Sequence, residues 1–332
     1  MKRLVYYSLS ASKACPRPDL IWQIEQSIRS LRAYNHSVSI VVFTYGDVPA
    51  ELAPALAPYG VALHHKGSYQ SALARLAPRG WQTLSQYPLL HKFLNFGEIA
   101  AQNPEQVLFV DCDTLFFQDV DLLFSRYAEA ECYAREEPTC RRSHYGYDAT
   151  YVDEDALARL GAEEKITLPP PFNLGVVSLN HGIWHKLAAL EPVFLNYAWR
   201  FAVWMAQNPP EGVAASYGEG EGINYLRQYF DQLADEQDVG RALPYPSGNR
   251  WILDQAALWF ALGHVPGLRY EDYSTRDVLQ NGELLTRRRE ECDWLLCHYF
   301  SQNTTRVVEW VSQPEASSAP DEARQEFPVA AL

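Results

Sequence analysis

Residues 107–113 read Val-Leu-Phe-Val-Asp-Cys-Asp, so that two aspartates separated by a single residue directly follow an apolar run. In an extended chain, side chains two positions apart point the same way and lie roughly 7 Å apart, so Asp111 and Asp113 aim at one point while Cys112 faces the other side. Two carboxylates that converge in a cleft repel each other unless a cation lies between them. A hard divalent ion, Mg²⁺ or Mn²⁺, suits such oxygen ligands. The pair therefore predicts a metal site that completes its coordination with substrate phosphates.

A solvated loop is the alternative interpretation of this stretch. Aspartates also stand near the start of helices, and Asp119 and Asp121, just before the segment Leu-Leu-Phe-Ser-Arg-Tyr, fit that role better than Asp111 and Asp113 do. The pair alone leaves both interpretations open. The decision depends on the residues that the fold brings beside it.

Short apolar strands alternate with helical segments in the first half of the chain. Strands are predicted over residues 4–9, 37–47, 61–64 and 107–110, and helices after Asp19 and over residues 87–100. Such interleaving implies crossover connections, and it predicts an α/β fold with a mostly parallel central sheet flanked by helices. Ligands bind outside the carboxyl ends of the strands in such sheets, and Asp111 and Asp113 stand at one of these ends.

The second half of the chain is less regular. Strands are predicted over residues 132–137 and 174–180, one or two helices over 183–207 and a further helix over 249–263. The Gly- and Pro-rich segment at 208–222 is either a mobile lid or a connector. We expect a single domain over residues 1–312, followed by a flexible tail over 313–332, because that segment is polar and contains proline.

Net charge and aromatic content narrow the set of ligands. The chain has 332 residues and a net charge of −13 at pH 7. Tight binding to nucleic acid relies on Lys and Arg that neutralise phosphates, so we expect no nucleic-acid partner. An anionic substrate would need a metal or a few placed cations here. The 20 Tyr and 9 Trp residues suit a sugar-binding cleft, and filling a large core explains most of them equally well.

The cysteines and the N-terminus favour a cytoplasmic protein. Six cysteines are present, and none forms a Cys-x-x-Cys pair or a metal-ligand ladder. The first ten residues read as a charged start and a strand rather than as a signal peptide, and no run of 18 apolar residues predicts a membrane span. We therefore expect reduced cysteines and a cytoplasmic location, with peripheral membrane contact still open.

Three further motifs follow the aspartate pair in order: Pro-Phe-Asn-Leu-Gly at 171–175, Leu-Asp-Gln at 253–255 and Cys-His-Tyr at 297–299. With the strand that ends in Asp-x-Asp, they resemble the glycosyltransferases of the GT-A fold, and most closely the retaining enzymes of family 8. The resemblance covers roughly residues 4–299. It implies a Rossmann-like fold with a donor half, about residues 1–120, and a smaller, irregular acceptor half, about residues 121–312.

The implied activity is metal-dependent transfer of a hexose from a nucleotide-diphosphate sugar to a hydroxyl group. A UDP-sugar is the first expectation for the donor, the acceptor is an unknown glycan, lipid or protein, and the anomeric configuration is retained. The resemblance assigns Mn²⁺ or Mg²⁺ to three ligands, Asp111, Asp113 and His298.

The same resemblance assigns the remaining site residues. Asn173, Asp254 and Gln255 would act as catalytic side chains around the donor sugar. Contacts with the nucleotide-sugar are expected from a larger group, which comprises Tyr7, Ser8, Lys92, Asp111, Asn173 and Gly175. Within this group, Lys92 would offer a point charge and Gly175 would allow close backbone approach.

Three departures from the family pattern bear on donor binding. The family follows its late histidine with Gly and then a Lys that grips the diphosphate. Neither stands at that spacing here, which makes Asn303 and Arg306 the candidate substitutes. The first strand lacks the acidic residue often used to read uracil, which leaves the base open. Leu174 stands where family members often have Gly or Ser.

Each carried-over residue also has a purely structural interpretation. His298 would be a core histidine, and Lys92 would be a solvated surface charge. Asn173 would be a turn residue after consecutive prolines, and Asp254 would be a favourable acid in the first turn of a helix.

Two other functions compete with sugar transfer. Haloacid-dehalogenase-like phosphatases also end a strand in Asp-x-Asp, with the first Asp as nucleophile. Their motif requires Thr or Val two residues past the second Asp, where this chain has Leu115, and it usually opens the fold rather than following three strands. A non-catalytic sugar-nucleotide or glycan-binding protein of the same fold also fits, because the late Lys and the acid of the first strand are missing.

Overall fold

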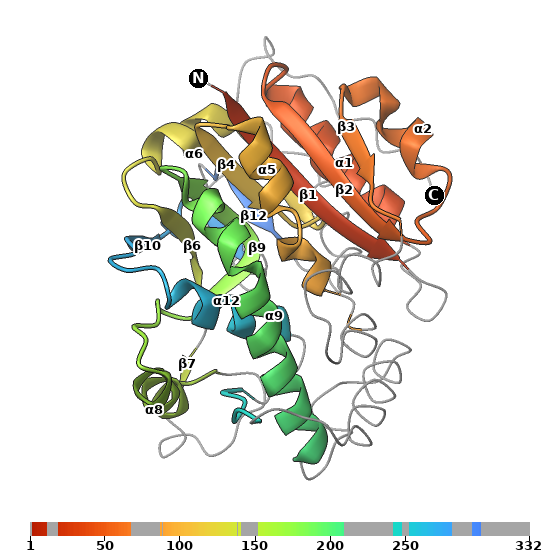
Figure 1. The fold of residues 1–332 in the computed structure, drawn as a ribbon. Helices are drawn as coiled ribbons and strands as arrows, with labels where there is room; N and C mark the ends of the chain where they lie inside the picture. The colour runs from red at the N-terminus through yellow and green to blue at the C-terminus, as the bar shows by residue number, and fades with distance from the viewer. Residues whose placement is uncertain are drawn as a thin grey trace.

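The structure is a computed structural model that describes residues 2–11, 19–67, 87, 89–137, 139–140, 152–208, 242–247, 252–280 and 294–299. These residues form an α/β fold around a seven-stranded sheet (Figure 1). The α/β class, with a mostly parallel central sheet flanked by helices, is therefore confirmed. Most of the Gly- and Pro-rich segment interpreted as a lid or a connector, residues 209–222, and the predicted tail, residues 313–332, lie outside the described residues, as do Asn303 and Arg306.

One strand of the central sheet runs against the other six. The strands lie in the order β10-β6-β9-β4-β1-β2-β3, and the described pairs are parallel except the two made by β9. Their bounds are Arg3–Ala11 for β1, Ser39–Gly46 for β2, Ala62–His65 for β3, Gln106–Val110 for β4, Cys132–Glu136 for β6, Phe172–Asn180 for β9 and Tyr270–Asp272 for β10. The amino end of β9 therefore lies at the same edge as the carboxyl ends of the other strands.

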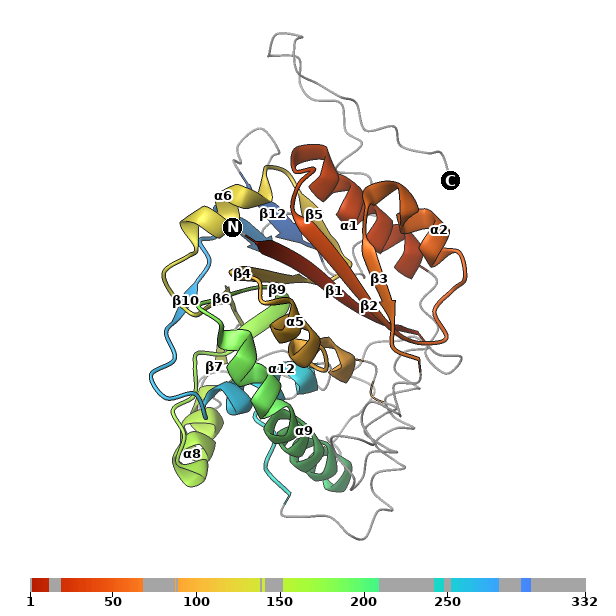
Figure 2. The same cartoon turned by 45° about the horizontal axis from the view of Figure 1, so that its top comes forward.

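Successive side chains of a strand point to opposite faces, so the central strands feed two separate cores. Tyr6 and Phe109 belong to one core, whereas Val5 and Leu108 belong to the other. The first core is covered by η2 (Leu90–Phe93), α5 (Phe96–Gln102), α9 (Ile183–Gln207) and α12 (Leu253–Leu262). The second is covered by α1 (Leu20–Tyr34), α2 (Leu52–Leu56) and α6 (Val120–Arg126). Figure 2 shows α1 and α2 on one side of the sheet and α5, α9 and α12 on the other.

The first helix forms where the sequence predicts it. α1 begins directly after Asp19 and buries Ile24, Ile28 and Leu31 against the sheet. These residues recur at helical spacing and therefore make one apolar stripe. Each such side chain contributes about 1.5–3 kcal/mol when it is fully buried.

The helix predicted over residues 87–100 is interrupted. A 3₁₀ turn, η2, precedes the short helix α5, and Asn95 lies between them. The Asn95 side chain accepts a hydrogen bond from the Tyr45 hydroxyl at 2.6 Å and donates to Ser8 Oγ at 3.1 Å. These bonds to the sheet hold Asn95 at the N-terminal end of α5 instead of inside one continuous helix. Lys92, within η2, reaches the end of β4, where its Nζ donates to Oδ2 of Asp111 at 2.8 Å.

A second, three-stranded sheet joins C-terminal residues to the aspartate pair. It comprises, in order, β11 (Val278–Gln280), β12 (Leu296–His298) and β5 (Thr114–Phe116). β12 runs antiparallel to β5, and His298 stands opposite Thr114. This pairing brings the late histidine motif beside the turn that holds Asp111 and Asp113.

Smaller elements complete the described part of the chain. They are η1 (Ala57–Tyr59), α8 (Glu154–Glu164) and the paired short strands β7 (Thr139–Cys140) and β8 (Val152–Asp153). None of the described helices is both long enough and apolar enough to cross a lipid bilayer.

Candidate functional site

The carboxyl end of β4 carries the aspartate pair. All five residues of β4 are buried, and the chain turns through Cys112 and Asp113 before β5 begins. The Asp111 N–H donates to the carbonyl oxygen of Gly175 at 2.8 Å, which holds the turn against β9. Asp113 is only 7% exposed. A carboxylate this buried is costly unless charged or hydrogen-bonding groups stand beside it, so the neighbours of the pair decide its role.

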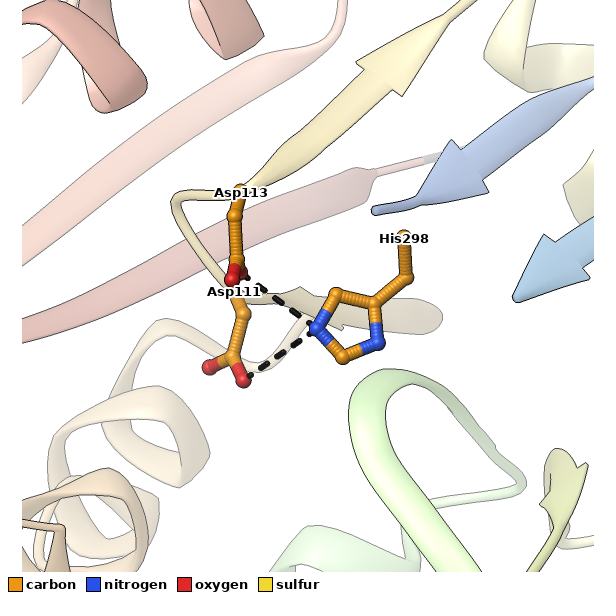
Figure 3. A group of neighbouring side chains, drawn as sticks. All are labelled: Asp111, Asp113 and His298. Carbon is orange, nitrogen blue, oxygen red and sulfur yellow. Dashed lines mark ion pairs between the residues drawn. The ribbon is translucent and has the colours of Figure 1, made fainter. Parts of the chain in front are cut away.

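Three side chains from distant parts of the sequence converge at this turn (Figure 3). Nε2 of His298 lies 3.3 Å from Oδ1 of Asp113 and 3.9 Å from Oδ2 of Asp111. The three residues each offer one ligand atom, and these atoms all lie within 4.8 Å of one another. The N–H of Tyr299 donates to the Asp113 carbonyl at 2.9 Å, which fixes the histidine backbone at this point. Two carboxylate oxygens and one imidazole nitrogen around a common point fit Mn²⁺ or Mg²⁺.

Gly175 provides the space that the His298 ring occupies. A Cβ atom on Gly175 would overlap Cε1, Nδ1 and Cγ of that ring. The Gly175 backbone is held on both sides, because its N–H donates to Asn173 Oδ1 at 2.7 Å and its carbonyl accepts from Asp111. The motif at 171–175 therefore supports the third candidate metal ligand directly. The close approach of the Gly175 backbone to a nucleotide-sugar donor stays a prediction.

Lys92 lies inside the site rather than on a solvated surface. Its Nζ lies 2.8 Å from Oδ2 of Asp111 and 3.9 Å from Oδ2 of Asp254, and the residue is 8% exposed. Burial by itself lowers the pKa of Lys92, but Asp111 and Asp254 together hold it above its ordinary value. Lys92 is therefore a charged ammonium group that partly balances the acids around it.

Asp254 stands in the first turn of α12 and is 1% exposed. Burial raises the pKa of its carboxyl group to about 7, and the nearby ammonium group of Lys92 acts in the opposite direction. A carboxyl group with a pKa near neutrality exchanges protons in the physiological range, as catalytic acids and bases do. Asp254 therefore differs from a routine helix-start acid, which would be ionised and solvated.

The raised pKa of Asp254 predicts a pH-dependent contribution to folding stability. An aspartate in the unfolded chain ionises near about 3.9, whereas Asp254 ionises at about 7 in the folded protein. Its contribution is fully present below pH 4 and is lost as the pH rises through 7, a loss of a few kcal/mol at about 1.4 kcal/mol per pKa unit. We expect Asp254→Asn to lose less stability than the wild type between pH 4 and pH 8. Denaturant unfolding at several pH values across this range measures the free energy of unfolding of both proteins. The same dependence of that free energy on pH in the two proteins would contradict a raised pKa for Asp254.

Asn173 and Gln255 meet at a fourth carboxyl group of the site, that of Glu137. Asn173 Nδ2 donates to Glu137 Oε1 at 2.7 Å. The Gln255 amide nitrogen, in the orientation that satisfies its neighbours, donates to the same Oε1 and to the Phe172 carbonyl, each at 3.0 Å. Burial raises the pKa of Glu137, and the hydrogen bond from Asn173 acts against this rise.

Sequence reasoning missed Glu137. It directly follows β6, a strand that runs in the same direction as β4, so it lies at the same edge of the sheet as Asp111. Glu137 stands at the carboxyl end of a predicted strand, as Asp111 does, and this position could have identified it. The neighbouring Glu136 makes the sequence ambiguous, because the spacing alone does not say which of the two acids faces the site.

The two residues predicted on the first strand point away from each other. Tyr7 is buried under α1, where its hydroxyl lies 2.9 Å from Ser27 Oγ. Ser8 faces the other core and pairs its Oγ with Nδ1 of His91 at 2.8 Å. Within the described residues, neither side chain bonds to Asp111 or His298, and their contacts with a donor stay predictions.

Comparison with protein-family models gives no match, and comparison with curated protein sequences gives none either. Among solved structures, the chain is similar to mouse xyloside xylosyltransferase 1 in its apo form, at 16% identity and a TM-score of 0.41, over 89% of this chain and 96% of that one. It is also similar to the glycosyltransferase GlyE of Streptococcus pneumoniae TIGR4, at 16% identity and a TM-score of 0.42, over 91% of this chain and 56% of that one.

A third similar structure is the galactosyltransferase LgtC in complex with donor and acceptor sugar analogues. The identity is 12% and the TM-score 0.43, over 90% of this chain and 86% of that one.

Proposed function

We propose that this protein is a glycosyltransferase of the GT-A type, which transfers a sugar from a nucleotide-diphosphate sugar to a hydroxyl group of an acceptor. The observation that carries the proposal is the convergence of Asp111, Asp113 and His298, with Nε2 of His298 3.3 Å from Asp113 Oδ1. The three residues come from two motifs that resemble those of family 8, and the other two motifs supply neighbouring groups. A divalent cation site beside polar side chains suits a nucleotide-sugar, because the cation neutralises the diphosphate and the polar groups can bond to the sugar hydroxyls.

Asp111, Asp113 and His298 would hold Mn²⁺ or Mg²⁺. When bound, the ion stabilises the negative charge that develops on the diphosphate leaving group. Lys92 adds a fixed positive charge at the same place, since its ammonium group stays protonated between Asp111 and Asp254. In a protein with a net charge of −13, these local cations are what make an anionic donor acceptable.

The remaining side chains suit the sugar half of the donor. Asn173, Gln255 and Glu137 form one hydrogen-bonded group, and Asp254 stands next to Gln255 at the start of α12. Preorganised polar groups of this kind stabilise the positive charge that grows on the sugar as the glycosidic bond breaks. We include retention of configuration in the proposal, on the basis of the family 8 resemblance. We also include a cytoplasmic location, which the buried thiols of Cys112, Cys132 and Cys297 support.

A thermal-shift screen tests the proposal. Purified protein is melted with UDP-, GDP- and dTDP-sugars, each with Mn²⁺, with Mg²⁺ and with EDTA. We expect one nucleotide family to raise the melting temperature only when a divalent ion is present, since a ligand at 100 times its Kd stabilises by about 2.7 kcal/mol.

The screen is followed by turnover assays with the stabilising donor. Release of the nucleotide diphosphate that stops with EDTA would support sugar transfer. Hydrolysis of a generic phosphate ester without any response to nucleotide-sugars would favour the phosphatase alternative. Donor binding without turnover across a broad acceptor panel would favour a non-catalytic binding protein.

A further inference from the structure

Glu137 lies where two amide side chains of the site meet, and nothing in the motif pattern assigns it a role. Resting on the proposed function, we propose that Glu137 is a positioning residue that fixes which end of the Gln255 amide faces the donor sugar. Its Oε1 accepts from the amide nitrogens of both Asn173, at 2.7 Å, and Gln255, at 3.0 Å. The role of Glu137 depends on one property of a carboxylate, which accepts hydrogen bonds but does not donate them when it is ionised.

An amide group is ambiguous, because its oxygen and nitrogen ends are nearly equal in shape and opposite in hydrogen-bonding character. An ionised carboxylate only accepts hydrogen bonds, so it selects the NH₂ end of each amide that touches it. The Phe172 carbonyl, 3.0 Å from the same nitrogen of Gln255, makes the same selection. The Gln255 carbonyl oxygen therefore takes the opposite position.

The selected orientation suits the chemistry of the proposed reaction. The carbonyl oxygen is the negative end of the amide dipole, and the sugar carbon gains positive charge as its bond to the diphosphate breaks. A fixed dipole pointing its negative end at that carbon lowers the barrier, whereas the flipped amide would raise it. Asn173 is fixed in the same way, because its nitrogen donates to Glu137 and its oxygen accepts from the Gly175 N–H.

The electrostatic setting of Glu137 also indicates a role in the site. Burial raises the pKa of Glu137, whereas the hydrogen bond from Asn173 and the electrostatic effect of His298 lower it. Glu137 therefore lies within electrostatic reach of a candidate metal ligand, and a partly buried carboxylate in such a place is typical of functional sites. Glu136, the preceding residue, is exposed and makes the matched control.

Glu137→Gln tests the inference. The variant keeps the size of the side chain but no longer forces the NH₂ end of Gln255 toward position 137. Misplaced reacting groups cost on the order of 100-fold in rate, so we expect kcat to fall by about that factor with the donor KM changed less than about 3-fold. Glu136→Gln, which removes the same charge one residue away, should retain wild-type kcat and KM.

A double-mutant cycle separates positioning from a purely structural role. If Glu137 acts through Gln255, adding Glu137→Gln to Gln255→Ala should cause a much smaller loss of kcat than Glu137→Gln causes alone, because interacting residues are not additive. The remaining loss is due to Asn173, whose oxygen is still held by the Gly175 N–H. A multiplicative loss, or an equal fall in Glu136→Gln, would overturn the proposal. So would a wild-type kcat for Glu137→Gln.

A measurement on the wild-type protein covers the case in which Glu137→Gln does not fold. The side-chain NH₂ resonance of Gln255 is assigned by its disappearance in Gln255→Ala. We expect this group to be protected at least 10-fold against hydrogen exchange relative to a free glutamine amide, and an unprotected group would contradict the proposal. Wild-type protein without metal-dependent donor binding would instead reject the proposed function itself, so the two failures are distinguishable.

Discussion

Asp113→Asn is expected to reduce sugar transfer on the order of 1,000-fold and to remove tight Mn²⁺ binding. The substitution keeps the shape of the side chain but removes the negative charge that stands 3.3 Å from Nε2 of His298. Hard divalent ions bind through charged oxygen ligands, so a neutral amide oxygen replaces a strong ligand with a weak one. The backbone bond from Tyr299 to the Asp113 carbonyl does not involve the side chain, so the fold should persist.

Mn²⁺ titration followed by electron paramagnetic resonance measures this effect directly. EDTA should abolish wild-type transfer and leave the residual rate of Asp113→Asn unchanged, because the variant has little bound ion to lose. Asp155→Asn, which removes an exposed acid on α8, serves as the charge-matched control and should bind Mn²⁺ like the wild type. Full activity of Asp113→Asn, or wild-type transfer that is indifferent to EDTA, would remove the basis of the proposed function.

Gly175→Ala is expected to disable the site through sterics alone. The backbone of Gly175 lies outside the positive-φ region, so alanine meets no backbone strain there. The added methyl group would overlap three atoms of the His298 ring, which is itself 4% exposed and has little room to move. Overpacking of this kind costs about 1–3 kcal/mol of stability. We expect Mn²⁺ affinity to fall by about 10- to 100-fold, as when a residue that orients a metal ligand is changed.

A control variant and a second genetic background test whether the effect of Gly175→Ala comes from contact with the His298 ring. Gly97→Ala, on α5, places its methyl group in open space and should leave Mn²⁺ affinity unchanged, with a small gain in stability from better helix propensity. In a His298→Ala background the ring is gone, so Gly175→Ala should then cause no further loss of metal affinity. Wild-type Mn²⁺ affinity in the single Gly175→Ala variant would show that Gly175 does not support the histidine.

Local pattern was sufficient for six of the seven strands of the central sheet and for the aspartate pair, but it missed the edge strand β10 and the reversed direction of β9. The mostly apolar segments predicted as strands at 107–110 and 174–180 lie in β4 and β9, which are buried along their whole length, as expected for the centre of an α/β sheet. The position of Asp111 at the carboxyl edge follows from that strand alone. The helix over 87–100 was wrong as one unit, because Asn95 gains hydrogen bonds to Tyr45 and Ser8 that no helical pattern reveals.

The sequence by itself determined the α/β class, six strands of the central sheet and the edge at which Asp111 and Asp113 stand, because these depend on the period of apolar residues over short segments. Only the tertiary structure decided that His298 reaches the pair through β12 and β5, that Gly175 leaves room for its ring, and that Glu137 joins Asn173 and Gln255. Each of these contacts joins residues from different strands or helices. Their geometry depends on which surfaces the whole chain buries together, and no local spacing encodes that choice.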